Sequence, residues 1–174
     1  MKRRLLIPLA VAGMVLVSGP ATARAANVQC DPGPDDCIGT EGADEIRGTN
    51  DADNIFALGG DDEVNLLDGD DVVDGGDGDD EINDAGGNDE IRGGPGGDTI
   101  VAGGGDDLVR GSRGGDLIRG GGGADDLRGG KGNDFIIAND GEADVVNCGA
   151  GASDAVRYDT GLDTLVNCEI LDAR

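Results

Sequence analysis

The sequence has no histidine and no tryptophan, and it has only one tyrosine and two phenylalanines among 174 residues. Without histidine, the chain cannot build a Ser-His-Asp triad, a histidine-ligated zinc site or a histidine general base. Basic residues are also scarce, because 13 Lys and Arg stand against 37 Asp and Glu. The resulting net charge of −24 would repel nucleic-acid phosphates, so we expect no nucleic-acid partner.

Glycine and aspartate are the residues that the chain has in excess, with 35 Gly and 30 Asp. An acidic chain with few large apolar residues is typical of a disordered polyanion. The same composition is typical of a chain that needs a counter-cation. Composition leaves both interpretations open, so the order of the residues must decide between them.

The first 25 residues have the pattern of a secretory signal peptide. Three bases at positions 2–4 precede an apolar run from Leu5 to Val17, and small residues up to Ala25 give an A-x-A cleavage pattern. The apolar run is shorter than the roughly 20 residues that a membrane span needs. We therefore expect export and no membrane span after cleavage. Removal of residues 1–25 takes away four bases and no acid, which changes the net charge to −28.

Four cysteines lie in the expected mature chain: Cys30, Cys37, Cys148 and Cys168. An even number of cysteines in an exported protein predicts disulfides. Three pairings are possible, and one of them, Cys30 with Cys37 and Cys148 with Cys168, places one disulfide near each end. A cysteine metal cluster is the alternative, but CxxC spacing is missing.

From residue 39 to residue 137 the sequence repeats every nine residues, eleven times without a gap. Position six is always Asp, position eight is always aliphatic, and position four is Gly in every row except the one with Asp51. Eleven Asp in one column would occur by chance at about 10⁻⁸, so the period reflects structure rather than composition. The aspartates of position six are Asp44, Asp53, Asp62, Asp71, Asp80, Asp89, Asp98, Asp107, Asp116, Asp125 and Asp134.

The nine-residue period divides into a six-residue turn and a three-residue strand whose central aliphatic residue points inward. Glycines permit the turns to be tight. Two units make one 18-residue coil, and stacked coils pair their strands in parallel at about 4.8 Å. The sequence therefore predicts an all-β fold, a parallel β-roll or β-solenoid, in which the whole array is the folding unit.

Each position-six aspartate lies where a turn meets a strand, so stacked turns would place carboxylates in a column along each edge of the roll. Such a column is strongly repulsive on its own. Dense hard oxygens from carboxylates and backbone carbonyls are ligands for Ca²⁺, whereas Mg²⁺ prefers smaller, octahedral and partly hydrated sites. The pattern therefore predicts several calcium ions as the cofactor.

Two rows, 75–83 and 129–137, read G-G-x-G-x-D-x-U-x, and residues 80–98 and 116–134 match the longer pattern D-x-[LI]-x4-G-x-D-x-[LI]-x-G-G-x3-D. In these motifs the chain resembles the RTX, or haemolysin-type, calcium-binding nonapeptide repeat. The resemblance implies a β-roll with Ca²⁺ between the turns of successive coils. It also implies that position-six side chains and backbone carbonyls at the start of each turn are the ligands, and it assigns that role to all eleven aspartates.

The repeat suggests four segments: a signal peptide at 1–25, an N-terminal cap at 26–38, eleven calcium-binding repeats at 39–137, and degenerate repeats with a C-terminal cap at 138–174. The ending is similar to that of small secreted repeat proteins of actinobacteria. The ligand role is not carried onto the equivalents of position six whose glycines are missing or where cysteines intrude: Asp35, Asp144, Asp154 and Asp163.

Positions seven and nine should face outward, because side chains alternate along a strand. On one sheet this exposes an apolar group, which we expect the C-terminal segment of the chain to cover. The group is Thr99, Val101, Leu117, Phe135 and Ile137.

The leading functional hypothesis is a secreted, non-enzymatic protein that folds outside the cell when it binds Ca²⁺. An alternative is a structural or adhesive module of the envelope or matrix, with calcium as a structural cofactor. A third is a glycan hydrolase that uses paired carboxylates. The sequence identifies no partner other than calcium.

Overall fold

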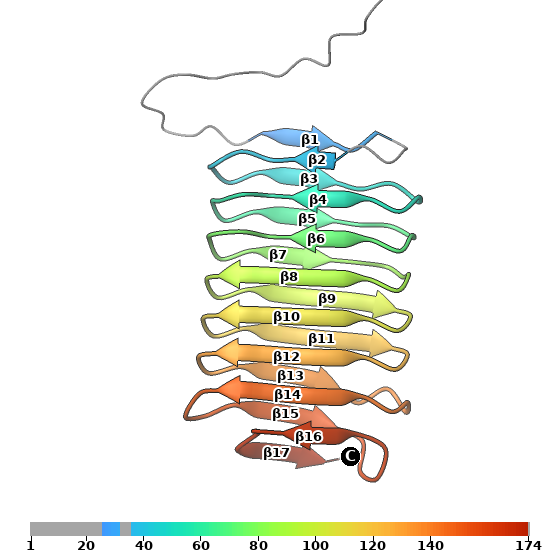
Figure 1. Cartoon of the computed structure of the whole chain (residues 1–174), viewed down its shortest axis with the longest axis vertical. Coiled ribbons are helices and arrows are strands. Elements are labelled where there is room, and N and C mark those ends of the chain that lie inside the picture. Colours follow the sequence, from blue (N-terminus) through green and yellow to red (C-terminus); the bar gives the residue numbers. More distant parts are fainter. Residues whose placement is uncertain (1–25, 32–35, 174) are drawn as a thin grey trace, which may run out of the picture.

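The computed structural model describes residues 26–31 and 36–173, so the predicted signal peptide lies outside the described residues. Within these ranges the chain forms strands and turns, and it has no helix long and apolar enough to cross a membrane. The strands stack as the rungs of a ladder (Figure 1). The prediction of a parallel β-roll is confirmed.

Two sheets run the length of the roll, one built from the odd-numbered strands and one from the even-numbered strands. The odd-numbered sheet contains β1 (Asn27–Gln29), β3 (Glu45–Arg47), β5 (Glu63–Asn65), β7 (Glu81–Asn83), β9 (Thr99–Gly104), β11 (Leu117–Gly122), β13 (Phe135–Ala138), β15 (Ala155–Tyr158) and β17 (Ile170–Ala173). The even-numbered sheet contains β2 (Asp36–Ile38), β4 (Asn54–Phe56), β6 (Val72–Asp74), β8 (Glu90–Pro95), β10 (Leu108–Arg113), β12 (Asp126–Lys131), β14 (Val145–Ala150) and β16 (Thr164–Val166).

The register of the sheets follows from the repeat length. Every pairing is parallel and joins a strand to the one two places further along the chain. In the repeats the paired residues are 18 apart, as in Ile46 with Val64 and Val64 with Ile82. Two nonapeptides therefore make one coil, as the sequence predicts.

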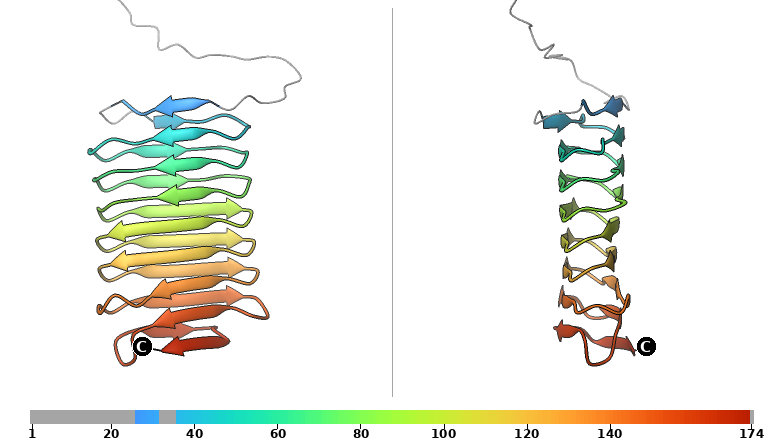
Figure 2. Two further views of the ribbon diagram at one scale, coloured as in Figure 1. Left: turned by 180° about the vertical axis from the view of Figure 1, so that it is seen from behind. Right: turned by 90° about the vertical axis from the view of Figure 1, so that its right-hand side faces the viewer.

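The core is a thin apolar layer between the two sheets, which face each other at close range in the right-hand view of Figure 2. All eleven position-eight side chains, from Ile46 to Ile136, are at most 2% exposed. Val146 and Val156 continue this column beyond the regular repeats. Burial of such side chains is the main apolar contribution to stability, and no single coil can supply it alone.

From β8 to β12 the strands have six residues rather than the expected three. In these rows positions one and two hold only Gly, Ala or Ser. Small residues let neighbouring backbones keep pairing beyond position nine, as the pairing of Ser112 with Gly94 and Gly130 shows. The turn is correspondingly shorter in this half of the roll.

Glycine at position four is required by the contact between successive turns. Gly78, Gly96 and Gly114 have φ values of 140°, 150° and 128°, which non-glycine residues rarely adopt. A Cβ atom on each would lie only 1.6 to 1.8 Å from the carbonyl oxygen of the glycine one coil earlier. Asp51, the exception at this position, has no positive φ, so its turn has a different shape.

Disulfides join Cys30 to Cys37 and Cys148 to Cys168, with Cα–Cα distances of 5.4 and 5.1 Å. This is the pairing that places one disulfide near each end. The C-terminal segment does not cover the outward apolar group, so that expectation is wrong. Instead β16 and β17 continue the two sheets as a last coil, and Leu117 stays 38% exposed.

Candidate metal centre

The turns form two edges of the roll, which lie at the right and left of Figure 1. The odd-to-even edge consists of turns that lead from an odd-numbered strand to the next strand, and it carries Asp53, Asp71, Asp89, Asp107 and Asp125. The even-to-odd edge carries Asp44, Asp62, Asp80, Asp98, Asp116 and Asp134. The structure thus brings the predicted residues together in two columns.

One carboxylate oxygen has a structural role in each position-six aspartate from Asp62 onward. The Oδ1 atom accepts a hydrogen bond from the backbone N–H of the aspartate one coil earlier, as Asp62 does from Asp44 and Asp80 does from Asp62. From the Asp44–Asp62 pair to the Asp144–Asp163 pair the N···O distances are 2.7 to 3.1 Å. We call this series the Oδ1 ladder. It satisfies buried amides that no sheet hydrogen bond reaches.

The second oxygen, Oδ2, is buried and unpaired along most of both columns. These side chains are at most 3% exposed, and their Oδ2 atoms accept no hydrogen bond from any residue that the structure describes. The residues with this feature are Asp62, Asp71, Asp80, Asp89, Asp98, Asp107, Asp116, Asp125, Asp134, Asp144 and Asp154. A buried charged oxygen without a partner is costly, so each of these atoms calls for a cation or a proton.

The pKa values of the buried aspartates reflect this cost of burying an unpaired charge. Burial raises the pKa of Asp62, Asp71 and Asp116 to about 6, and that of Asp98 and Asp107 to about 7. Desolvation is the largest cause, the Oδ1 ladder opposes it, and the carboxylates one coil away add repulsion. The columns are therefore poorly suited to hold their full negative charge at neutral pH without a counter-cation.

The surroundings of Oδ2 fit a hard cation. A Cβ atom on Gly93 or Gly111, at position one, would lie only 2.2 Å from Oδ2 of Asp98 or Asp116. The free carboxylate oxygen thus sits against bare backbone. No three acidic or cysteine side chains converge on one point in the described ranges, so an ion would take most of its oxygens from the backbone. Ca²⁺ accepts such mixed sets of six to eight oxygens.

The first two predicted residues differ from the rest. Oδ2 of Asp53 accepts the backbone N–H of Thr49 at 2.7 Å and also the Thr49 hydroxyl at 3.1 Å. Thr40 contacts Asp44 in the same way through its backbone N–H. The threonines stand at position two, where later rows hold mostly glycine. They satisfy the oxygens that elsewhere are unpaired.

Two residues beyond the regular repeats join the columns although the sequence analysis did not assign them. Asp144 and Asp154 are buried and have unpaired Oδ2 atoms, and burial raises the pKa of Asp144 to about 7. Each precedes an inward valine by two residues. This D-x-V pattern is still present where the glycines of the repeat are missing, and it could have identified both residues. Asp163 and Glu169 end the ladders by accepting the N–H groups of Asp144 and Asp154.

Position five carries a second ladder, of opposite direction, that sequence reasoning missed. Its Asp or Asn side chains accept the backbone N–H one coil later, as Asp106 does from Ala124 at 2.9 Å. Asn88 does the same from Asp106 at 2.8 Å. Because Asn and Asp are interchangeable here, the role needs an oxygen and not a charge.

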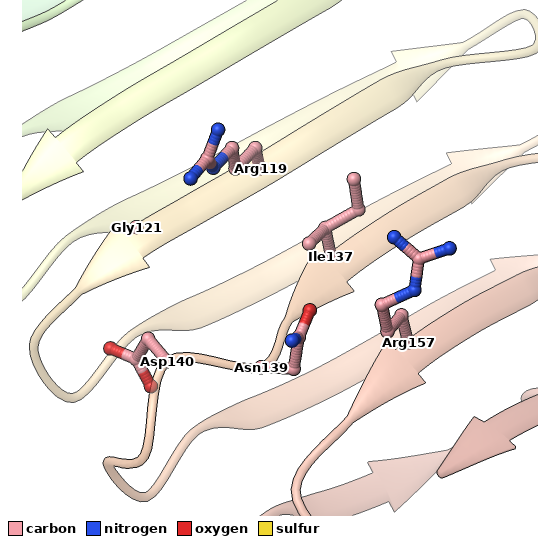
Figure 3. Close-up of a pocket in the computed structure, with 6 residues that line it drawn as sticks. All are labelled: Arg119, Gly121, Ile137, Asn139, Asp140 and Arg157. Atoms are coloured by element: carbon pink, nitrogen blue, oxygen red, sulfur yellow. The ribbon is translucent and has the colours of Figure 1, made fainter. Parts of the chain in front are cut away.

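A surface hollow of about 360 Å³ lies over β11, β13 and β15 of the odd-numbered sheet, and its lining includes two residues of the turn between β13 and β14 (Figure 3). Arg119 and Arg157 flank Ile137 there, and Asp140 is its one carboxylate. A glycosidase of the usual kind needs two carboxyl groups about the scissile bond. This hollow therefore gives no support to the glycan-hydrolase hypothesis.

A comparison with protein-family models decides the family. The model of the RTX calcium-binding nonapeptide repeat, which spans four copies, matches overlapping segments of the chain that together cover residues 38–153. The chain belongs to the RTX calcium-binding repeat family. Repeats of this family bind calcium, and the buried, unpaired carboxylates of this RTX protein fit that chemistry. The matched region includes the eleven predicted aspartates and Asp144. A search of curated proteins found no match.

Proposed function

We propose that this RTX protein is secreted, binds several Ca²⁺ ions along both edges, and folds as it binds them outside the cell. The observation that carries the proposal is the row of buried, unpaired Oδ2 atoms in a chain of a calcium-binding family. Nine of the eleven predicted ligands share this feature, and we add Asp144 and Asp154. For Asp44 and Asp53 the ligand role stays a prediction, because both already accept hydrogen bonds from threonine.

The mechanism is coupled binding and folding. Without calcium, ionised carboxylates must be buried one coil apart, and the expected mature chain carries a charge of −28. An ion that binds Oδ2 and nearby carbonyls removes both the desolvation cost and the repulsion. A preformed site does not exist in the unfolded chain, so the free energy of binding becomes free energy of folding.

Secretion is supported by two independent features. The signal-peptide pattern of residues 1–25 directs export, and two disulfides are typical of oxidising compartments. Extracellular calcium modules bind at about 10⁻⁴–10⁻³ M. Such affinities would keep the chain unfolded until it meets external calcium. We propose that residues 26–38 and 138–174 act as the caps of the roll.

The deciding experiment is a calcium titration followed by calorimetry and by far-UV circular dichroism. We expect binding of several ions together with a cooperative gain of β signal, which EDTA reverses. Mg²⁺ and KCl at matched ionic strength are the controls, because simple screening would also relieve repulsion. A spectrum that does not change with calcium, or that changes equally with Mg²⁺ or KCl, would contradict the proposal.

A structural or adhesive module is the second candidate. It is favoured by the outward apolar group on the odd-numbered sheet, which the described residues leave partly exposed at Leu117. A pull-down with cell envelopes, with and without calcium, tests this candidate. Calcium-dependent retention that a Leu117→Ser variant loses would favour adhesion, and release into the soluble fraction in both conditions would count against it.

A further inference from the structure

Position one of each row faces the interior, because it follows an outward position nine and an inward position eight. On the odd-to-even edge this column holds Gly48, Leu66, Asp84, Ala102 and Gly120. Asp84 is 9% exposed, and its neighbours one coil before and after, Leu66 and Ala102, belong to the buried core. An acidic side chain therefore stands in an otherwise apolar or glycine column.

Neither oxygen of Asp84 has a hydrogen-bond partner among the residues that the structure describes. Both Oδ1 and Oδ2 are buried and accept no hydrogen bond from the described part of the chain, and no arginine or lysine there pairs with Asp84. The Asp89 carboxylate of the same turn adjoins it and also has an unpaired Oδ2. Burial, followed by the contact with Asp89, raises the pKa of Asp84 to about 8.

Other turns show what the extra side chain changes. Where position one is glycine, a Cβ atom would lie within 2.2 to 3.0 Å of Oδ2 of the position-six aspartate, as at Gly120 beside Asp125. Position one therefore adjoins the Oδ2 atom of the position-six aspartate, which is unpaired from Asp62 onward. The turn of residues 84–89 brings a second carboxylate to that place, whereas the other turns of the repeat supply one.

We propose that Asp84 and Asp89 together form a calcium site with one more carboxylate ligand than the repeat itself provides, and that it is the tightest site of the roll. The inference rests on the proposed function and deepens it. Ca²⁺ affinity in proteins rises with the number of charged ligands. The row 84–92 is the sixth of eleven, so the first ion to bind would order the central coil.

The test compares calcium binding by the full-length protein and three variants. Asp84→Ala introduces the residue that Ala102 supplies one coil later, and Asp84→Asn keeps the shape without the charge. Asp70→Asn is the matched control, because it removes one charge from the same edge. It also keeps the oxygen that accepts the N–H of Asn88, as Asn88 itself does for Asp106. Calorimetry measures the affinity classes, and Tb³⁺, which favours carboxylate-rich sites, is used as a competing probe.

We expect the wild-type protein and Asp70→Asn to bind one ion about tenfold or more tightly than the rest, and both Asp84 variants to lose that ion's advantage while the remaining sites stay. Uniform sites in all four proteins would overturn the inference and would leave the proposed function intact. Unchanged calcium binding together with a more stable metal-free Asp84→Ala protein would overturn it as well, because Asp84 would then hold a proton. Absence of calcium binding by every protein would refute the proposed function itself.

Discussion

Replacement of one position-six aspartate by asparagine should have opposite effects with and without calcium. The change Asp107→Asn keeps the oxygen that accepts the N–H of Asp89 but removes the buried charge. A pKa of about 7 in place of 3.8 corresponds to about 4 kcal/mol against the ionised form in the folded state at neutral pH. We therefore expect Asp107→Asn to stabilise the metal-free roll by up to about 4 kcal/mol. With calcium it should bind more weakly, because one ligand has lost its charge.

The neighbouring residue supplies the control. Asp106→Asn removes the same charge from the same turn, but the Asp106 side chain is exposed and accepts the N–H of Ala124 as an asparagine can. Its effect on stability should stay within about 0.5 kcal/mol in both conditions.

The assay is circular dichroism during urea denaturation in calcium. In EDTA, folding is induced with trimethylamine oxide, which strengthens burial. Asp107→Asn should fold at a lower osmolyte concentration than the wild-type protein. If it is instead destabilised in both conditions, Oδ2 of Asp107 is not an uncompensated charge and the reasoning about the columns fails.

Three further predictions concern acid, turns and disulfides. Asp62 has a folded-state pKa of about 6, and Asp98 and Asp107 have one of about 7, against 3.8 when unfolded, so the free energy of unfolding of the metal-free protein should rise as the pH falls from 7 towards 4. Circular dichroism in EDTA across this range should show a gain of β signal, and a loss would contradict the pKa directions. Gly105→Ala should lower the free energy of unfolding by at least about 3 kcal/mol, because φ is 130° at this residue and the added Cβ would lie 1.8 Å from a carbonyl oxygen. Gly104→Ala should be tolerated, because its Cβ would lie 3.7 Å from the nearest atom. Equal losses of stability in urea denaturation would show that the turns do not stack as described. Loss of the Cys148–Cys168 disulfide, which closes a 20-residue separation, should lower stability by about 3 kcal/mol and more than loss of Cys30–Cys37, whose separation is 7; the reverse order in thermal melts would contradict the loop-entropy account.

The sequence predicted the features that depend on the period. A strict nine-residue register places every position-eight side chain in the core and every position-six aspartate at an edge, and Ile46 and Asp62 are found where the register puts them. The length of the strands was not predictable in the same way. Strand length depends on whether two neighbouring coils both have small residues at positions one and two, which is a property of the stack rather than of one row.

The consequences of departures from the repeat also could not be predicted from the sequence. The period gave no reason to expect that Thr40 and Thr49 satisfy the aspartates of the first two rows, or that both oxygens of Asp84 are buried without a partner among the described residues. Each of these roles depends on what lies one coil away. The C-terminal segment was misjudged for a related reason. Its own inward Leu165 and its pairing with β14 let it extend the roll rather than cover a face.

The Oδ1 ladder has one direction along the chain, because every donor precedes its acceptor in the sequence. Each aspartate amide of the ladder is satisfied by a carboxylate that comes 15 to 20 residues later in the chain. If the chain is exported with its N-terminus first, as we propose, it presents donors before their acceptors, and the newest coil stays incomplete until the next one emerges. A chain that ended at residue 138 would leave the amides of Asp125 and Asp134 without the acceptors that Asp144 and Asp154 provide. Completion of the fold is thereby tied to the arrival of the last segment, where Asp163 and Glu169 close the two series.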